Sequence, residues 1–280
     1  MPLLDRTLPL PGGGAIPVFG LGTWRMGEQA GRRAEEADAI RHALDLGVRL
    51  IDTAEMYGEG GAEEVIGEAL AGRRDGVFLV SKVYPHHASR RELPLACERS
   101  LRRLRTERLD LYLIHWRGRF PLEESFGALA RLREQGKIAA YGVSNFEVED
   151  LEEAAACDRG LTASNQILYN LARREAEWAV LPWCRQHGMP VMAYCPLDQG
   201  RLVRRPELRR VAERVGATPA QAALAWLLAQ EGVVVIPKSS SRERIQENVG
   251  AGQVRLDAAA RAELDRAFPP PRRAARLGII

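Results

Sequence analysis

Short apolar runs rich in β-branched residues alternate with amphipathic segments along the whole chain. The apolar runs predict strands that end at Gly22, Thr53, Val83, His115, Asn145, Tyr169, Pro196 and Lys238. Apolar residues recur with helical spacing near 31–46, 61–73, 90–105, 122–135, 147–157, 175–187, 206–230 and 242–250. Strands that are each followed by a helix predict a parallel sheet. At 280 residues, the pattern favours a closed (β/α)8 TIM barrel that forms one domain over residues 1–280.

The main alternative is an open, doubly wound sheet. Such a fold normally carries G-x-G-x-x-G after its first strand. Gly20-Leu21-Gly22-Thr23-Trp24-Arg25 starts in this way but lacks the last glycine, so the barrel is favoured. Two segments fall outside the repeat. Residues 7–18 predict a β-hairpin under the barrel, and residues 257–268 predict an extra C-terminal helix.

Composition narrows the class of protein. The net charge of +3 is too small to indicate nucleic-acid binding by itself. No apolar run approaches the ~20 residues of a membrane helix, and Met1–Pro11 has no apolar core of the kind found in a signal peptide. The four cysteines show no C-x-x-C spacing, which predicts a reduced, cytoplasmic protein. We expect a monomer, and an oligomer remains open.

Ionisable side chains occur at three consecutive strand ends. Asp52, Lys82 and His115 end these strands, and Tyr57 follows in the loop after Asp52. Each residue has an ordinary alternative: Asp52 could cap a turn, and His115 could be a rim histidine. Only three of the 40 basic residues are lysines. The skew could simply reflect genome composition, but it makes Lys82 and Lys238 candidates for positions that need an ammonium.

Together these four residues suggest proton donation to a carbonyl. A Lys82 cation, held by Asp52, is expected to depress the pKa of Tyr57, and His115 could orient the carbonyl oxygen.

Six segments, in this order and at these spacings, make the sequence resemble the aldo-keto reductases over nearly its whole length. They are Phe19–Trp24, Leu50–Tyr57, Val80–Tyr84, Leu113–Trp116, Tyr141–Phe146 and Ile236–Ser239. The likeness is greatest to bacterial members that reduce small aldehydes, including methylglyoxal. It implies an NADPH-dependent reductase of small-molecule carbonyls, with Asp52, Tyr57, Lys82 and His115 as the catalytic tetrad. A cofactor-binding regulatory subunit of the same fold remains an alternative.

The resemblance also implies a set of cofactor-binding residues. Trp24 and Asp52 would line the nicotinamide end. Ser144, Asn145 and Gln166 would hold the carboxamide, and Tyr194 would stack on the nicotinamide ring. Lys238, Ser239 and Arg244 would bind the 2′-phosphate, and Glu247 and Asn248 would contact the adenine. Leu197 also belongs to the expected cofactor-binding set. Two departures stand out. Ser240 occupies a position where many relatives have an aromatic residue, and the short tail suggests that the loop narrowing the substrate pocket is largely absent.

Several remaining residues have competing interpretations. Trp24, Tyr84, His115 and Trp116 are expected to line the substrate pocket, although Tyr84 and Trp116 could simply pack the rim. Arg201, Arg204 and Arg205 could approach the cofactor pyrophosphate or form a solvated loop. The pair His86-His87 lacks accompanying acidic residues, so no metal site is predicted, and a metal-dependent hydrolase is disfavoured. The cysteines, Cys195 included, are interpreted as inert.

Overall fold

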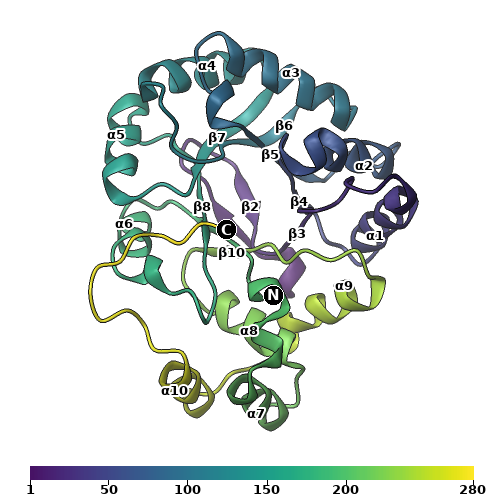
Figure 1. Ribbon diagram of the computed structural model, residues 1–280, viewed down its shortest axis with the longest axis vertical. Coiled ribbons are helices and arrows are strands. Elements are labelled where there is room, and N and C mark those ends of the chain that lie inside the picture. The colour runs from purple at the N-terminus through teal and green to yellow at the C-terminus, as the bar shows by residue number, and fades with distance from the viewer.

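A parallel sheet of eight strands forms the centre of the computed structural model, which describes residues 1–280 (Figure 1). Its strands are β3 (Gly20–Gly22), β4 (Leu50–Asp52), β5 (Phe78–Val83), β6 (Leu109–Ile114), β7 (Ile138–Ser144), β8 (Asn165–Leu168), β9 (Val191–Tyr194) and β10 (Val233–Val235). Each strand pairs with the next in chain order. Parallel bridges from Phe19 to Val235 and from Gly22 to Lys238 join the first strand to the last. The predicted TIM barrel is therefore confirmed.

Helices surround the sheet. They are α1 (Arg33–Asp45), α2 (Gly61–Ala69), α3 (Glu92–Leu104), α4 (Leu122–Glu134), α5 (Val148–Asp158), α6 (Val180–Gln186), α7 (Pro206–Arg214), α8 (Pro219–Leu228), α9 (Arg242–Val249) and α10 (Ala258–Ala267). In α3, Leu93, Cys97, Leu101 and Leu104 are buried at intervals of three or four residues, so one face packs on the sheet. No helix combines the length and apolar character that crossing a bilayer would require.

Two predicted helices differ from the observed ones. The predicted helix over 206–230 is two helices, α7 and α8. Gly216 lies between them with φ of 67°, and Thr218 forms a capping box with Gln221 that starts α8. The predicted helix over 175–187 begins as a 3-10 turn at Glu175–Glu177, and its α-helical part is α6.

The predicted N-terminal hairpin closes the floor of the barrel. Strands β1 (Thr7–Pro9) and β2 (Ala15–Pro17) pair antiparallel. Ile16 is fully buried and clusters with Leu50, Val80 and Leu111, whose side chains fill the barrel interior. Because this end is filled by apolar side chains, a functional site must lie at the opposite mouth, where the strands end.

The C-terminal segment returns to that mouth. After α10 the chain runs back across the barrel, and its end lies over the centre of the sheet in Figure 1. Arg174 anchors the start of this path, because its guanidinium donates to Glu177, to Asp265 of α10 and to the Phe268 carbonyl. Nearer the end, the Leu277 backbone N–H donates to Glu147 Oε1 at 2.7 Å.

Candidate active site

Four ionisable side chains converge at the mouth of the barrel. Asp52 ends β4, Lys82 lies in β5, His115 follows β6, and Tyr57 begins the 3-10 turn η3 (Tyr57–Gly60) after β4. Asp52, Lys82 and His115 are buried, and Tyr57 is half-buried. Parallel strands bring their carboxyl ends to one edge, so Asp52 and His115, which are 63 positions apart in the chain, become neighbours.

The Lys82 ammonium has three oxygen partners. Its Nζ donates to Asp52 Oδ2 at 2.8 Å, to the Thr53 carbonyl at 2.7 Å and to Tyr57 Oη at 3.3 Å. The side chain is fully buried. A guanidinium, which is planar and larger, could not take this place. The geometry thus agrees with the retention of lysine in an arginine-rich chain.

Burial governs the protonation of Tyr57. Burial, and then the negative charge of Asp52, raises the pKa of Tyr57 well above its ordinary value. The expectation that Lys82 would depress this pKa is therefore wrong in direction. Asp52 compensates the Lys82 charge, and a phenolate at this half-buried position would lose part of its hydration. Tyr57 is consequently a neutral phenol that retains a proton to donate.

His115 is also neutral. Burial, followed by the Lys82 charge, lowers the pKa of His115 to about 2. Its ring meets that of Tyr57 edge-on at 5.8 Å between centroids, and its Nδ1 is buried without a hydrogen-bond partner. A neutral imidazole beside a phenol can donate a hydrogen bond to an uncharged carbonyl oxygen.

A ladder of amide and hydroxyl groups continues from the tetrad around the mouth. Gln166 Nε2 donates to Asp52 Oδ1 at 2.7 Å, and Ser144 Oγ donates to the Gln166 carbonyl at 2.8 Å. Asn145 Nδ2 donates to the His115 carbonyl at 3.1 Å, and Tyr194 Oη donates to Asn145 Oδ1 at 2.9 Å. These bonds fix the groups that face the cavity.

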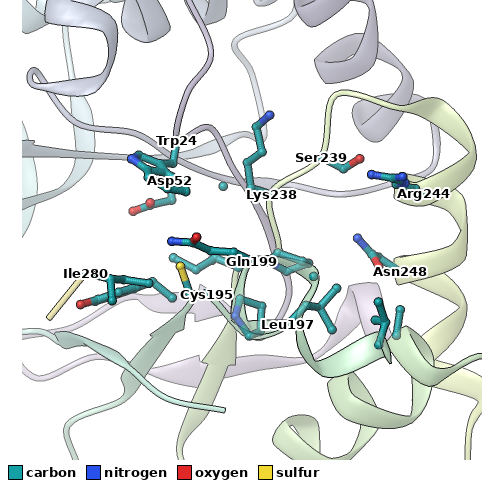
Figure 2. Close-up of a pocket in the computed structure, with 18 of the residues that line it drawn as sticks. Trp24, Asp52, Cys195, Leu197, Gln199, Lys238, Ser239, Arg244, Asn248 and Ile280 are labelled. Carbon is teal, nitrogen blue, oxygen red and sulfur yellow. The ribbon is translucent and has the colours of Figure 1, made fainter. Parts of the chain in front are cut away.

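A cavity of about 1120 Å³ extends away from the tetrad (Figure 2). Trp24, Asp52 and Cys195 lie toward one end of it, and Ser239, Arg244 and Asn248 lie at the other, with Leu197 and Gln199 below the space between them. Lys238 and Glu247 also line the cavity. All the residues expected to bind a cofactor therefore line a single elongated space, and Arg244 places a cation at its far end.

The substrate end of the cavity has a different wall from the one expected. Trp24, His115 and Trp116 line it, but Tyr84 does not. The Tyr84 ring lies edge-on to Trp116, at 6.0 Å between centroids, and supports that residue from behind. The short tail does not leave this side bare, because Ile279 and Ile280 line the cavity.

Sequence reasoning missed several lining residues. Met56, Arg25, Gln199, Ile279 and Ile280 all contribute to the wall. Met56 precedes Tyr57 and could have been included on that ground. The apolar end of the tail was visible as Leu277-Gly278-Ile279-Ile280, but nothing in the local sequence shows where it folds.

The three arginines after β9 separate into different roles. Arg201 forms a pair of 2.9 Å hydrogen bonds with Asp198, and Arg205 pairs with Glu207. Only Arg204 lines the cavity. Of the expected pyrophosphate contacts, Arg204 is therefore the one whose position suits the role.

The residues considered for other chemistry are engaged elsewhere. His87 Nδ1 lies 3.0 Å from Glu55 Oε1, and His86 packs against the Tyr84 ring. No group of three or more His, Cys, Asp or Glu side chains gathers as a metal site would require. Burial raises the pKa of Cys195 to about 11, so its thiol stays protonated at neutral pH.

At the mouth of the barrel, two segments pack directly backbone against backbone, with no side chain between them. A Cβ on Gly27, which has φ of 75°, would lie 2.1 Å from the carbonyl carbon of Gly61. The Gly27 N–H donates to the buried Glu36 carboxylate at 2.8 Å. The loop that carries Trp24 is thereby seated against the loop that carries Tyr57.

Comparisons with known proteins agree with this geometry. The sequence model of the Aldo/keto reductase family matches residues 18–268. Methylglyoxal reductase YeaE of Escherichia coli strain K12 is 45% identical over 282 residues, which cover 99% of each chain. Methylglyoxal reductase DkgB of Escherichia coli O157:H7 is 35% identical over 251 residues, covering 87% of this chain and 90% of the relative. The crystal structure of an aldo-keto reductase from Klebsiella pneumoniae in complex with NADPH superposes with a TM-score of 0.95 and 47% identity, covering 98% of this chain and 99% of that one.

Proposed function

Because the chain belongs to the aldo/keto reductase family, we propose that it reduces small aldehydes and ketones to alcohols, with Tyr57 as the proton donor. The protein is an NADP-dependent oxidoreductase. The observation that carries the proposal is the contact of Lys82 Nζ with both Asp52 Oδ2 and Tyr57 Oη at one end of the long cavity. We propose that the enzyme works in the cytoplasm, which is consistent with its four free cysteines.

The residues present fit NADPH. The lining of the cavity runs from the tetrad to the cationic side chains Lys238 and Arg244. Asn145 and Gln166, which also line it, offer amide groups suited to a carboxamide. Lys238, Ser239 and Arg244 would hold a 2′-phosphate, and Glu247 and Asn248 would face the adenine. When bound, NADPH supplies the hydride that reduces the carbonyl carbon.

The chain itself supplies and controls the proton. Tyr57, a neutral phenol, donates its proton to the carbonyl oxygen as that oxygen becomes an alkoxide. The phenolate left behind faces the Lys82 ammonium, which is 3.3 Å from the oxygen. Asp52 holds that ammonium in place, and the neutral His115 ring donates a hydrogen bond that orients the carbonyl.

The wall of the substrate end favours small and aromatic carbonyl compounds. Trp24, Trp116 and Met56, with Ile279 and Ile280, give the cavity apolar surface beside the tetrad residues that line it. An apolar wall separates substrates weakly, because a methylene is worth about 1–3 kcal/mol there. We therefore propose broad activity that includes α-oxo-aldehydes such as methylglyoxal, which the names of two relatives also support.

The experiment is an assay of NADPH oxidation, followed by the loss of absorbance near 340 nm. Its substrates are methylglyoxal, a nitrobenzaldehyde, a short aliphatic aldehyde, an aldose and a steroid ketone. The aldehydes should have the higher kcat/KM values. Tyr57→Phe should lower kcat by roughly 10²–10⁴ and leave the Kd for NADPH nearly unchanged.

Tyr84→Phe is the matched control, because Tyr84 lies behind Trp116 and outside the cavity. It should retain near-normal kcat. If Tyr57→Phe also retained kcat while the chemical step limited turnover, the role given to Tyr57 would be wrong. A kcat/KM for the steroid above that of every aldehyde would refute the proposed substrate class.

A further inference from the structure

The start of α1 lies against the cationic end of the cavity. The Arg32 guanidinium, at the end of the 3-10 turn η2 (Ala30–Arg32), donates to Ser240 Oγ at 3.1 Å. Farther along, Asp38 of α1 forms two hydrogen bonds with Arg242 of α9, at 2.8 and 2.9 Å. Figure 1 shows α1 and α9 as neighbours at the edge of the barrel. The segment that carries Lys238, Ser239 and Arg244 is therefore flanked by α1.

The Arg32 guanidinium lies near this end as a further cation beside Lys238 and Arg244. The Arg32 guanidinium contacts Ser240, and the preceding residue, Ser239, lines the cavity. Its charge also reaches Lys238: burial lowers the pKa of Lys238, Glu36 opposes this, and Arg32 lowers it further. Like charges gathered in this way repel each other in the empty protein, and a polyanion would relieve that repulsion.

Arg32 is free to engage a ligand. Its only carboxylate partner is Glu35 at 3.2 Å, and both side chains are exposed, by 43% and 58%. Exposed ion pairs of this kind contribute little to stability, so Arg32 can leave Glu35 at small cost.

We propose that Arg32 is a third cation of the 2′-phosphate site and helps the enzyme select NADPH over NADH. The inference rests on the proposed placement of the cofactor, with its 2′-phosphate between Lys238, Ser239 and Arg244. A guanidinium donates charge-assisted hydrogen bonds to phosphate oxygens, and NADH presents only a hydroxyl at this position. Arg32 thus acts on specificity without touching the reacting atoms.

The test compares two neighbouring arginines. Arg32→Met removes the proposed contact and keeps an unbranched side chain. Arg33→Met is the matched control, because the Arg33 guanidinium points to α2 and pairs with Glu64 at 2.9 Å and Glu68 at 2.8 Å. Tryptophan fluorescence gives the Kd values for NADPH and NADH. Arg32→Met should raise the Kd for NADPH by about tenfold, equal to about 1.4 kcal/mol, and change that for NADH less than twofold.

Two further arms separate charge from structure. Adenosine 2′,5′-bisphosphate and AMP serve as fragment probes, and only binding of the bisphosphate should weaken in Arg32→Met. Ser240→Ala removes the hydrogen bond to Arg32 but keeps the cation, so it should retain the NADPH preference. If Ser240→Ala reproduced the loss, Arg32 would merely position the segment, and the inference would fall. Thermal melting checks that each variant is folded.

The outcomes also separate this inference from the proposed function. Equal loss of NADPH and NADH affinity in Arg32→Met, or no loss at all, overturns the inference. If Lys238→Met erodes the preference while Arg32→Met does not, the cofactor placement stands and only the role of Arg32 is rejected. Equal affinity for both cofactors in the unmutated protein would reject the placement itself.

Discussion

Burial sets the proton affinities of the individual residues around Lys82. It raises the pKa of Tyr57 and lowers those of His115 and Lys82, and in each case it is the largest influence. Asp52 opposes the effect on Lys82. The site therefore holds a neutral acid and a neutral imidazole next to a compensated ion pair. Sequence reasoning found these residues, but it weighed the Lys82 charge above desolvation, since burial depth is not visible in a local motif.

The lowered pKa of His115 predicts a loss of stability in acid. Between pH 6.5 and about 2 the unfolded chain binds a proton at this histidine and the folded protein does not, so stability falls as the pH falls. From pH 7 to 4.5, the unfolding free energy of the native protein should drop by roughly 2–3 kcal/mol more than that of His115→Asn. Urea unfolding at both pH values measures this.

His86→Asn, which alters an exposed histidine, is the control and should follow the native protein. If the unfolding free energies of the native protein and His115→Asn fell equally between the two pH values, the conclusion that the His115 ring is neutral would be contradicted.

At the scale of elements, the loops at the mouth determine how the site is assembled. The β3–α1 loop meets the β4–α2 loop through Gly27 and Gly61, and the C-terminal segment covers a third side with Ile279 and Ile280. The first contact joins residues that a cofactor would touch to Tyr57, the proposed proton donor. The second shapes the space left for a substrate.

Gly27→Ala tests the contact between the two loops. The new methyl group would have to occupy space 2.1 Å from the Gly61 carbonyl carbon, at a φ of 75° that alanine adopts poorly. We expect a loss of about 2 kcal/mol or more in unfolding free energy, together with a lower kcat. Thermal melting and the aldehyde assay measure the two effects.

Gly31→Ala is the matched control, because its Cβ would meet no atom within 4 Å and its φ is not positive. It should leave melting temperature and kcat near normal. A Gly27→Ala protein with native stability would show that the loops can separate without cost.

The C-terminal segment should affect the substrate and not the cofactor. The double change Ile279→Ser and Ile280→Ser removes apolar surface from the substrate end, so KM for a nitrobenzaldehyde should rise roughly 3–10-fold. The Kd for NADPH should stay constant, also after deletion of residues 272–280. Leu95→Ser, on an exposed leucine of α3, should change neither. Loss of NADPH binding in the deletion would assign the tail a different role.

The elements show what sequence could and could not foretell. The short apolar runs placed every barrel strand, because a strand buried on both faces is an apolar run of a few residues. The first strand, Gly20–Gly22, holds no β-branched residue and was placed by its position in the repeat. The division of 206–230 into α7 and α8 was readable from Gly216 and from Thr218-Pro219 but was overlooked. The course of the tail was not readable, because it depends on a contact between Leu277 and Glu147, 130 residues apart.

At the scale of the whole molecule, the barrel is filled at one end and open at the other. Ile16 and Leu10 close the floor, and the long cavity crosses the mouth from β4 to α9. A ligand in that cavity would contact strand ends and loops from both halves of the chain. A bound ligand would therefore link strand ends and loops that lie far apart in the chain.

This linkage predicts stabilisation by the cofactor. At 100 times its Kd, NADPH should add about 2.7 kcal/mol, which raises Tm by roughly 5–10 °C. NADH at the same concentration should give less than half the rise. In the double variant Lys238→Met and Arg244→Met, the two cofactors should give similar shifts, as differential scanning fluorimetry can show.

The control removes two exposed arginines outside the cavity, in Arg90→Met with Arg91→Met, and should retain the full NADPH effect. Equal shifts for NADPH and NADH in the native protein would contradict the assignment of the cationic end.

The three hydrogen-bond acceptors around the Lys82 ammonium affect how this amine can react with an aldehyde. A primary amine and an aldehyde ordinarily condense to an imine, which requires a free lone pair on nitrogen. The Lys82 nitrogen directs its N–H bonds to Asp52, Thr53 and Tyr57 and has no exposed surface. Under the proposed function, an aldehyde bound against Tyr57 would meet an amine that cannot attack it, and the enzyme would be protected from covalent capture by such a substrate.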